Sequence, residues 1–201
     1  ELLYAATLTN DKARQEAIYK KTTELYPNDF RAYNNLGMMA YANGDFTTAE
    51  NYFKQAASKD ANAPEVNTNL GYIELVKGNV ANAETYLSKS TGANTANEAL
   101  GNLYTKQGQY DRAVQAFGDT KTNSAALAQI LAKDYNKAKN TLNAVKNPDA
   151  YTDYLMAIVG ARTNNADLVK TSMAKVAQKD ATLAAKAQID REFAKYANEI
   201  K

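Results

Sequence analysis

A repeat of 34 residues constrains this chain more than any other feature of its sequence. Gly37 and Gly71 lie 34 residues apart, and each follows a leucine. The same spacing recurs in three further pairs: Gly44 and Gly78, Ala49 and Ala83, and Tyr52 and Tyr86. This period is typical of a helix-turn-helix unit that cannot bury its apolar face alone and stacks on its neighbours. The sequence therefore predicts an all-α array of antiparallel helix pairs.

The glycines of the repeat indicate where the helices and turns fall. Glycine inside a helix costs about 0.8–1 kcal/mol relative to alanine, so Gly37 and Gly71 predict places where two helices approach closely. Gly44 predicts a left-handed residue at the end of a helix. Asp45 or Thr47 then begins the next helix, with Glu50 three residues after Thr47 as a capping box. Gly118 lies outside this frame, so we expect the Gly118→Ala substitution to have only a mild effect on stability.

Later units keep the pattern at less regular spacing. Lys133-Asp134 and Asn164-Asn165 stand where the turn glycine is expected, and asparagine tolerates the left-handed conformation better than most residues. The final segment carries an apolar stripe, at Ile189, Phe193, Tyr196 and Ile200, that predicts one capping helix. We expect a single array over residues 1–201: a partial repeat at 1–29, repeats at 30–63, 64–94, 95–122, 123–147 and 148–179, and the cap at 180–201.

The repeat frame resembles that of tetratricopeptide repeats, which carry Leu-Gly in the first helix, glycine at the turn and small residues at the helix crossing. Leu70, Gly71, Gly78 and Ala83 match this pattern, whereas Asn67 takes the place of an aromatic residue. The resemblance implies a right-handed α-solenoid whose first helices line a concave face. It also implies a non-enzymatic scaffold that binds a protein or peptide partner on that face.

The resemblance also identifies candidate contact residues, because family members bind ligands at positions two, five, six, nine, twelve and thirteen of a unit. We call the resulting residues the predicted peptide-binding set: Arg31, Asn34, Asn35, Met38, Tyr41, Glu65, Asn69, Tyr72, Leu75, Val76, Asn102 and Lys106. In the fifth unit the same positions fall on Tyr151, Tyr154, Leu155, Ile158, Ala161 and Arg162. Some family members clamp acidic chaperone tails through residues whose places are taken here by Asn34, Met38, Thr68, Thr95 and Ala99. Only Asn69 fits that pattern, so the clamp is absent.

Two questions about this set stay open in the sequence. Asn35 and Asn69 resemble the start of an asparagine ladder for an extended peptide, but such amides also bridge neighbouring helices. The apolar members, Met38, Tyr41 and Tyr72 among them, line a groove in one interpretation and belong to the core in the other.

Composition excludes several classes of function. The chain has no histidine and no cysteine, so it has no imidazole base, no thiolate nucleophile and no His or Cys metal site. We predict no catalytic, cofactor or metal residues. Ser172 and Lys175 match an S-x-x-K motif, but its companion motifs are missing and an ordinary helix is favoured. A carbohydrate-active enzyme would need an acid pair from Asp111, Asp134, Asp167 and Glu192, which suit helix caps and solvated faces better.

Charge and hydropathy bear on the partners. The net charge of +2 is spread without a basic block, so no nucleic-acid partner is expected. No apolar run approaches the roughly 18–20 residues of a membrane-spanning helix. The chain opens at Glu1 inside an incomplete repeat. Residues 26–29, 31–37, 154–162 and 190–193 together resemble the repeat region at the C-terminal end of larger bacterial cell-envelope proteins. This resemblance implies an exported parent; a structural spacer or self-associating module is the alternative function.

Overall fold

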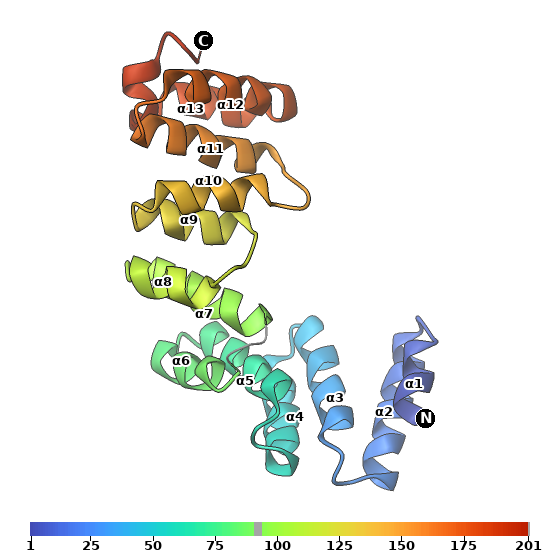
Figure 1. Cartoon of the computed structure of the whole chain (residues 1–201). Coiled ribbons are helices and arrows are strands. Elements are labelled where there is room, and N and C mark those ends of the chain that lie inside the picture. The colour runs from blue at the N-terminus through green and yellow to red at the C-terminus, as the bar shows by residue number, and fades with distance from the viewer. Residues whose placement is uncertain (91–93, 201) are drawn as a thin grey trace. The chain divides into compact units, whose positions relative to one another are not determined.

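The computed structural model describes residues 1–90 and 94–200, and this part of the chain forms thirteen α-helices, one 3₁₀ helix and no strand. The helices are α1 (Leu2–Thr7), α2 (Lys12–Leu25), α3 (Phe30–Ala42), α4 (Phe46–Lys59), α5 (Pro64–Val76), α6 (Val80–Ser88), α7 (Asn94–Lys106), α8 (Tyr110–Phe117), α9 (Asn123–Leu131), α10 (Tyr135–Asn143), α11 (Ala150–Arg162), α12 (Ala166–Lys179), α13 (Ala181–Gln188) and η1 (Arg191–Tyr196). The predicted all-α fold of helix pairs is confirmed (Figure 1).

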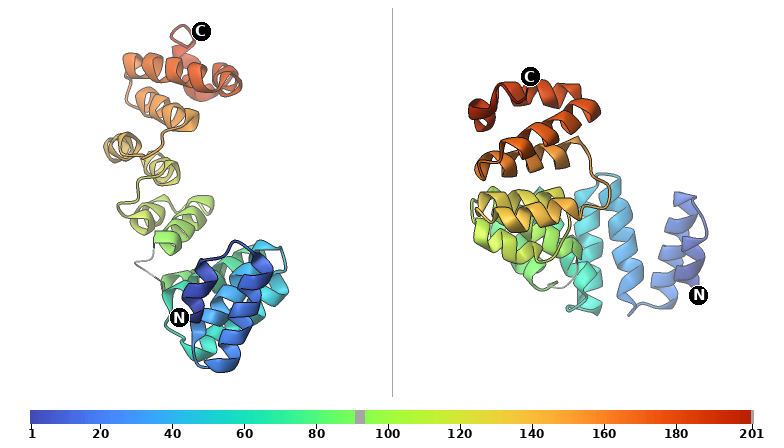
Figure 2. Two further views of the ribbon diagram at one scale, coloured as in Figure 1. Left: turned by 90° about the vertical axis from the view of Figure 1, so that its right-hand side faces the viewer. Right: turned by 45° about the horizontal axis from the view of Figure 1, so that its top comes forward.

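The chain divides into two compact units, which we call the N-terminal unit, Glu1–Ala99, and the C-terminal unit, Leu100–Lys201. In the N-terminal unit each helix from α1 to α6 contacts the next along the chain. In the C-terminal unit the same holds from α8 to α13, and α9 also contacts α11. Figure 2 shows the successive hairpins of each unit from two further directions.

The turns within the five helix pairs from α3 to α12 each contain a residue in the left-handed conformation. Gly44, Gly78 and Gly108 have φ angles of +80°, +77° and +74°, as the sequence predicts. Lys133, with φ of 64°, and Asn164, with φ of 55°, adopt this conformation where glycine is absent. Because a Cβ atom makes left-handed backbone costly, the Lys133 turn holds a local strain that the glycine turns lack.

Two expectations about local structure are wrong. The capping box of Thr47 and Glu50 does not form, because Asp45 is the N-cap of α4 and its carboxylate accepts a hydrogen bond from the N–H of Thr48 at 3.0 Å. Glu50 pairs with lysines instead. Gly118 ends α8 with φ of 55° and ψ of −120°, a conformation that disfavours any Cβ, so alanine there is strained.

The helical glycines lie where two helices of a pair come together. A Cβ atom built on Gly71 would lie 2.6 Å from Cγ of Leu87, and one built on Gly37 would lie 2.5 Å from the ring of Phe53. Both neighbours are buried side chains of the second helix of the pair. The prediction that these glycines permit close approach is therefore confirmed.

The C-terminal segment departs from the predicted single capping helix. The helix α13 ends at Gln188, and Asp190 begins η1 by accepting a hydrogen bond from the N–H of Glu192 at 2.8 Å. Ile189, at the break, is 85% exposed and so does not join the apolar stripe. Since α13 contacts α12 whereas η1 contacts α11, the break redirects the chain from one helix to the other.

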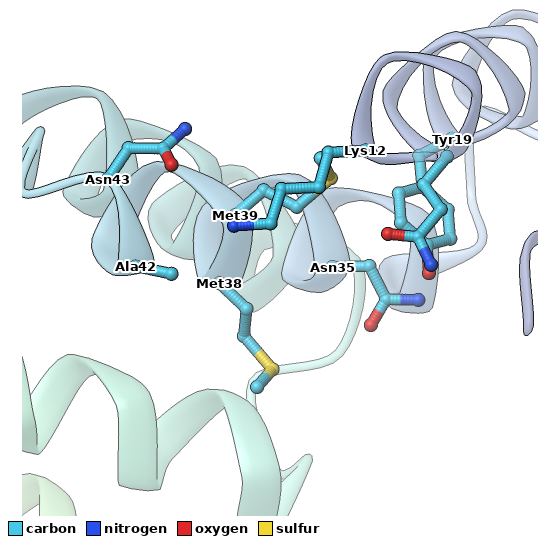
Figure 3. A pocket seen from close by; sticks show the side chains of 8 residues that line it. Lys12, Tyr19, Asn35, Met38, Met39, Ala42 and Asn43 are labelled. Atoms are coloured by element: carbon cyan, nitrogen blue, oxygen red, sulfur yellow. The ribbon is translucent and has the colours of Figure 1, made fainter. Parts of the chain in front are cut away.

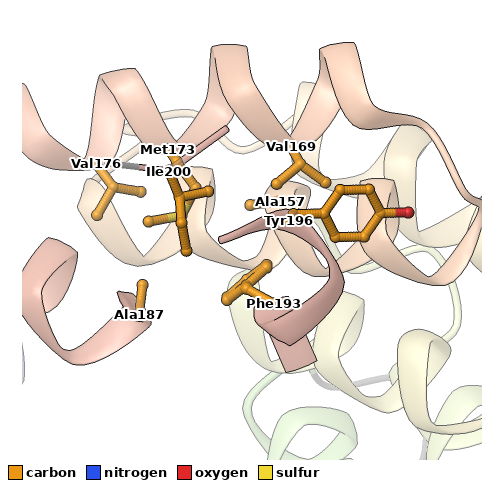
Figure 4. Close-up of a cluster of buried hydrophobic side chains, with 8 residues drawn as sticks. All are labelled: Ala157, Val169, Met173, Val176, Ala187, Phe193, Tyr196 and Ile200. Carbon is orange, nitrogen blue, oxygen red and sulfur yellow. The ribbon is translucent and has the colours of Figure 1, made fainter. Parts of the chain in front are cut away.

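The rest of the stripe is buried, as Figure 4 shows. Phe193, Tyr196 and Ile200 pack in one cluster with Ala157 of α11, with Val169, Met173 and Val176 of α12, and with Ala187 of α13. The C-terminal segment thus covers the apolar surface at the end of the C-terminal unit, which is the role expected of a cap in a repeat array.

Candidate functional site

The predicted peptide-binding set lies mainly on α3 and α5, the first helices of two consecutive pairs in the N-terminal unit. Ten of its twelve residues belong to these helices. Asn102 and Lys106 lie on α7 within the C-terminal unit, and both are exposed. We therefore describe the candidate site on α3, α5 and their neighbours in the N-terminal unit.

Two amides of the set join these helices to each other. The Nδ2 of Asn69 donates a hydrogen bond to the Oδ1 of Asn34 at 2.8 Å, and the Nδ2 of Asn34 lies 3.9 Å from the Sδ of Met38. Asn34 is buried. It is thus a contact between α3 and α5 rather than an open ligand position, which corrects its assignment to the binding surface. Asn69 is bonded as the bridging alternative describes.

The two tyrosines of the set are partly built into the helix packing. The hydroxyl of the half-buried Tyr72 donates a hydrogen bond to the carbonyl of Thr95 at 3.3 Å. Burial, and secondarily the charge of Glu98, raises the pKa of the Tyr72 hydroxyl, so this group remains a neutral donor. The ring of Tyr41 packs edge-on against Phe46, with 5.2 Å between centroids. Tyr41 and Tyr72 therefore combine a structural role with partial exposure.

The remaining members on α3 and α5 are accessible. Met38 and Val76 are 52% and 47% exposed, and Leu75 is half-buried. Arg31 and Glu65 are exposed, and the guanidinium of Arg31 is held by the carboxylate of Asp29 at 2.6 Å. The open part of the set is thus apolar, with charged residues near the start of each helix.

A cavity of about 230 Å³ opens beside this surface, between α2 and α3. Its lining comprises Asn35, Met38, Met39, Ala42 and Asn43 together with Lys12, Gln15 and Tyr19 (Figure 3). Asn35 and Met38 are members of the predicted set, whereas the α2 residues were not predicted. Their spacing of three and four residues forms one stripe on α2, and this stripe was the available signal in the sequence.

The cavity has apolar walls and one charged side chain. The amide of Gln15 is fixed by the end of α1, because its Nε2 donates to the carbonyls of Ala6 at 3.2 Å and Thr9 at 2.7 Å. Among the residues that line the cavity, Lys12 is the charged one, and none is acidic. The methionines Met38 and Met39 supply flexible, polarizable apolar surface that adapts to different side chains.

In the C-terminal unit, η1 meets the corresponding contact positions of α11. The hydroxyl of Tyr154 donates a hydrogen bond to the carboxylate of Asp190. The Nη2 of Arg162 donates to Glu192 at 2.6 Å, within a two-point ion pair. The bond from Tyr154 lowers the pKa of Asp190, while burial and the same bond raise the pKa of Tyr154. These positions of α11 therefore hold the chain's own C-terminal segment.

Two of the four acids weighed for an enzyme, Asp134 and Glu192, have structural partners. Asp134 caps α10 by accepting a hydrogen bond from the N–H of Lys137, and Glu192 is paired with Arg162. Ser172 of the S-x-x-K motif is buried on α12.

Across residues 1–90 and 94–200, no cluster of three Asp, Glu, His or Cys residues suits a metal ion. Within those same residues, no helix combines the length and apolar character needed to cross a membrane.

Comparison with protein families agrees with this architecture. Three tetratricopeptide repeat models match residues 18–51, 40–98 and 98–121, which together make up slightly more than half of the chain. The protein therefore belongs to the tetratricopeptide repeat family. No curated protein matches the chain.

Solved structures share the fold at low identity. PilF of Pseudomonas aeruginosa aligns with a TM-score of 0.71 at 13% identity, covering 93% of this chain and 89% of PilF. YrrB, a tetratricopeptide repeat protein with an unusual peptide-binding site, gives 0.65 at 17% identity, covering 84% and 97%. The Cut9–Hcn1 complex of APC/C gives 0.67 at 15%, covering 99% of this chain but only 42% of the matched chain. At such identities the likeness concerns the fold alone.

Proposed function

We propose that this tetratricopeptide repeat protein is an interaction scaffold that binds a segment of a partner protein at the cavity between α2 and α3. The observation that carries the proposal is the cavity of about 230 Å³, in which Met38 and Met39 form apolar walls and Lys12 supplies the charge. Repeat proteins of this kind use extended surfaces to bind partners. YrrB, which shares the fold, is described as having a peptide-binding site.

The lining defines the chemistry of the partner. An apolar side chain of the partner would enter between Met38, Met39 and Tyr19, where its burial contributes about 25 cal/mol per Å² of apolar area. A carboxylate or carbonyl beside that side chain would accept from Lys12. The side-chain amide of Asn35 offers a donor and an acceptor for a peptide backbone. Asn69 contributes less, because its Nδ2 is already bonded to Asn34.

Selection of displayed peptides tests this proposal without a known partner. Random twelve-residue peptides would be selected on the whole chain and their affinities measured by fluorescence anisotropy. We expect the selected peptides to share a large apolar residue next to an acceptor group. Met38→Glu should weaken their binding at least about tenfold, because it places a charge in the apolar wall.

Ile189→Glu is the matched control, since Ile189 is an exposed apolar residue that does not line the cavity. This variant should keep affinity within about twofold, and circular dichroism should show that both variants remain folded. Equal affinities of Met38→Glu and wild type for every selected peptide would refute the proposal.

A self-associating module is the second candidate function. Tyr4 and Leu8 at α1 are 69% and 70% exposed, and exposed apolar patches often mark contact surfaces. Sedimentation equilibrium of the wild type and of Tyr4→Ser/Leu8→Ser distinguishes the two candidates. A concentration-dependent dimer that the substitutions abolish would favour self-association, whereas a monomer that binds the selected peptides would favour the scaffold.

A further inference from the structure

A second cavity, of about 250 Å³, lies in the C-terminal unit between α10 and α12. Both are second helices of their pairs, and the first helix α11 lines the cavity as well, through Thr152, Asp153 and Met156. Half-buried Val145, Met156 and Leu168 give this cavity an apolar part, and the exposed Lys139 and Lys175 line it from α10 and α12. We call it the lysine groove.

The two lysines that define the groove have no counter-charge. Neither Lys139 nor Lys175 forms an ion pair with any residue in the described part of the chain. Asp153, the one carboxylate among the described residues that line the groove, is bound by the Nζ of Lys179 at 2.7 Å. Lys179 also donates to the carbonyl of Pro148 at 3.2 Å, which fixes it on Asp153. The lysines Lys139 and Lys175 are thus available to an external anion.

The net charge of the C-terminal unit also favours an anionic partner. The C-terminal unit contains 15 Lys and Arg against 10 Asp and Glu, a net charge of +5. The N-terminal unit contains 9 Lys and Arg against 12 Asp and Glu, a net charge of −3. The summed field of a protein surface steers oppositely charged partners toward it, so an anionic partner is drawn to the C-terminal unit.

From this charge complementarity we propose that the lysine groove binds an acidic segment of a partner protein, in which carboxylates flank an apolar side chain. The apolar side chain covers Val145, Met156 and Leu168, and the carboxylates pair with Lys139 and Lys175. An apolar centre with a polar, solvent-accessible rim is the usual anatomy of a protein interface. This binding is independent of the cavity between α2 and α3, which lies in the other unit.

Nuclear magnetic resonance titration of the isotope-labelled whole chain tests the proposal. The probe is a capped peptide of glutamate residues around two leucines, and its counterpart carries glutamine in place of every glutamate. We expect the acidic peptide to shift amide resonances of residues 139–145 and 168–175. The glutamine peptide should bind at least about tenfold more weakly, because it cannot form the ion pairs.

Two double variants with the same change in net charge separate a local site from general attraction. Lys139→Glu/Lys175→Glu should weaken binding of the acidic peptide about tenfold or more. Lys170→Glu/Lys186→Glu changes exposed lysines that do not line the groove, and it should weaken binding less than about threefold. Should the first variant fail to fold, Lys139→Gln/Lys175→Gln replaces it with the same expectation in direction.

Several outcomes overturn the proposal. One is equal weakening by both double variants, which would reduce the effect to net charge. Another is no binding of the acidic peptide, or resonance shifts confined to α2 and α3. Binding of phosphatidylserine vesicles without binding of the peptide would assign the groove to lipid headgroups. Self-association that Lys139→Glu/Lys175→Glu abolishes would assign it to a second copy of the chain.

Discussion

The Nδ2 of Asn69 donates a hydrogen bond to the Oδ1 of Asn34 across 2.8 Å, and so joins the first helices of two consecutive pairs. Tyr72 continues this link, because its hydroxyl donates to the carbonyl of Thr95 at the start of α7. Side chains that family resemblance assigns to ligand contact thus hold the repeats together in the N-terminal unit. A polar side chain on a first helix can therefore contribute to the packing of neighbouring repeats and to ligand binding, to different extents at different positions.

This link predicts a coupling between Asn34 and Asn69 in the free energy of unfolding. Asn34→Ala, Asn69→Ala and the double variant form a cycle, and we expect a coupling energy of about 0.5–1.5 kcal/mol. Asn69→Ala leaves the side-chain oxygen Oδ1 of the buried Asn34 without its donor, which is the costly situation for a buried polar group. Urea unfolding measures the cycle, and a coupling of zero would show that the hydrogen bond contributes nothing to stability.

The close approach at Gly71 predicts overpacking that a second substitution relieves. Gly71→Ala should destabilise the fold by about 1–3 kcal/mol, because the new Cβ would lie 2.6 Å from Cγ of Leu87. The clash is with the Leu87 side chain, so in the Leu87→Ala background Gly71→Ala should cost much less. Thermal unfolding of the single and double variants checks this.

Gly44→Asn is the matched control for Gly71→Ala. No atom lies within 4 Å of a Cβ built at Gly44, and its φ is +80°, which asparagine tolerates. We expect a loss of only a few tenths of a kcal/mol there. If Gly71→Ala cost the same in both Leu87 backgrounds, the loss would come from something other than the contact with Leu87.

The strained turn between α9 and α10 predicts a stabilising substitution. Lys133 has φ of 64°, and a left-handed residue with a Cβ costs roughly 1–2 kcal/mol. Lys133→Gly removes that cost. Part of the resulting gain in stability is offset, because glycine gives the unfolded chain more conformational freedom. We expect a net stabilisation of up to about 1 kcal/mol, and a smaller gain for Asn164→Gly, because asparagine tolerates this conformation. Differential scanning calorimetry measures both variants, and a destabilised Lys133→Gly would contradict the prediction.

The sequence predicted the fold well because the information was local and periodic. Gly44 and Gly71 each carry a physical demand, a left-handed turn or a close crossing, that shows in the sequence without knowledge of the neighbour. The break at Ile189 could not be predicted in this way. It depends on Phe193 reaching α11, a tertiary contact that the helical spacing of the stripe does not contain.

The candidate site was harder to predict than the fold. Family positions assigned the adjacent Asn34 and Asn35 both to the predicted peptide-binding set, yet Asn34 is buried against Asn69 while Asn35 lines the cavity. Which of two neighbouring amides meets solvent depends on the packing of α3 against α2 and α5. The lysine groove could not be predicted from the sequence for a related reason. Lys139 and Lys175 come from different helices, and they line one cavity only in the folded unit.

The bond between Tyr154 and Asp190 predicts a dependence of stability on pH. Because this bond lowers the pKa of Asp190 in the folded state, its contribution is present above the usual Asp pKa of about 3.9 and is lost as pH falls through the folded-state value. Burial first, and then the bond to Asp190, raises the pKa of Tyr154. That contribution is present below the usual Tyr pKa of about 10 and is lost as pH rises through the folded-state value.

Tyr154→Phe removes the hydrogen bond and keeps the ring that packs edge-on against Phe193. The difference in unfolding free energy between wild type and Tyr154→Phe should therefore be largest between about pH 5 and pH 9, and it should shrink on both the acidic and the alkaline side. Tyr151→Phe is the control on the acidic side, since Tyr151 stacks on Tyr154 and its hydroxyl forms no hydrogen bond with the described residues. Urea unfolding at a series of pH values measures these differences, and a Tyr154→Phe difference that stays constant from about pH 2 to pH 7 would show that the bond to Asp190 does not hold the C-terminal segment.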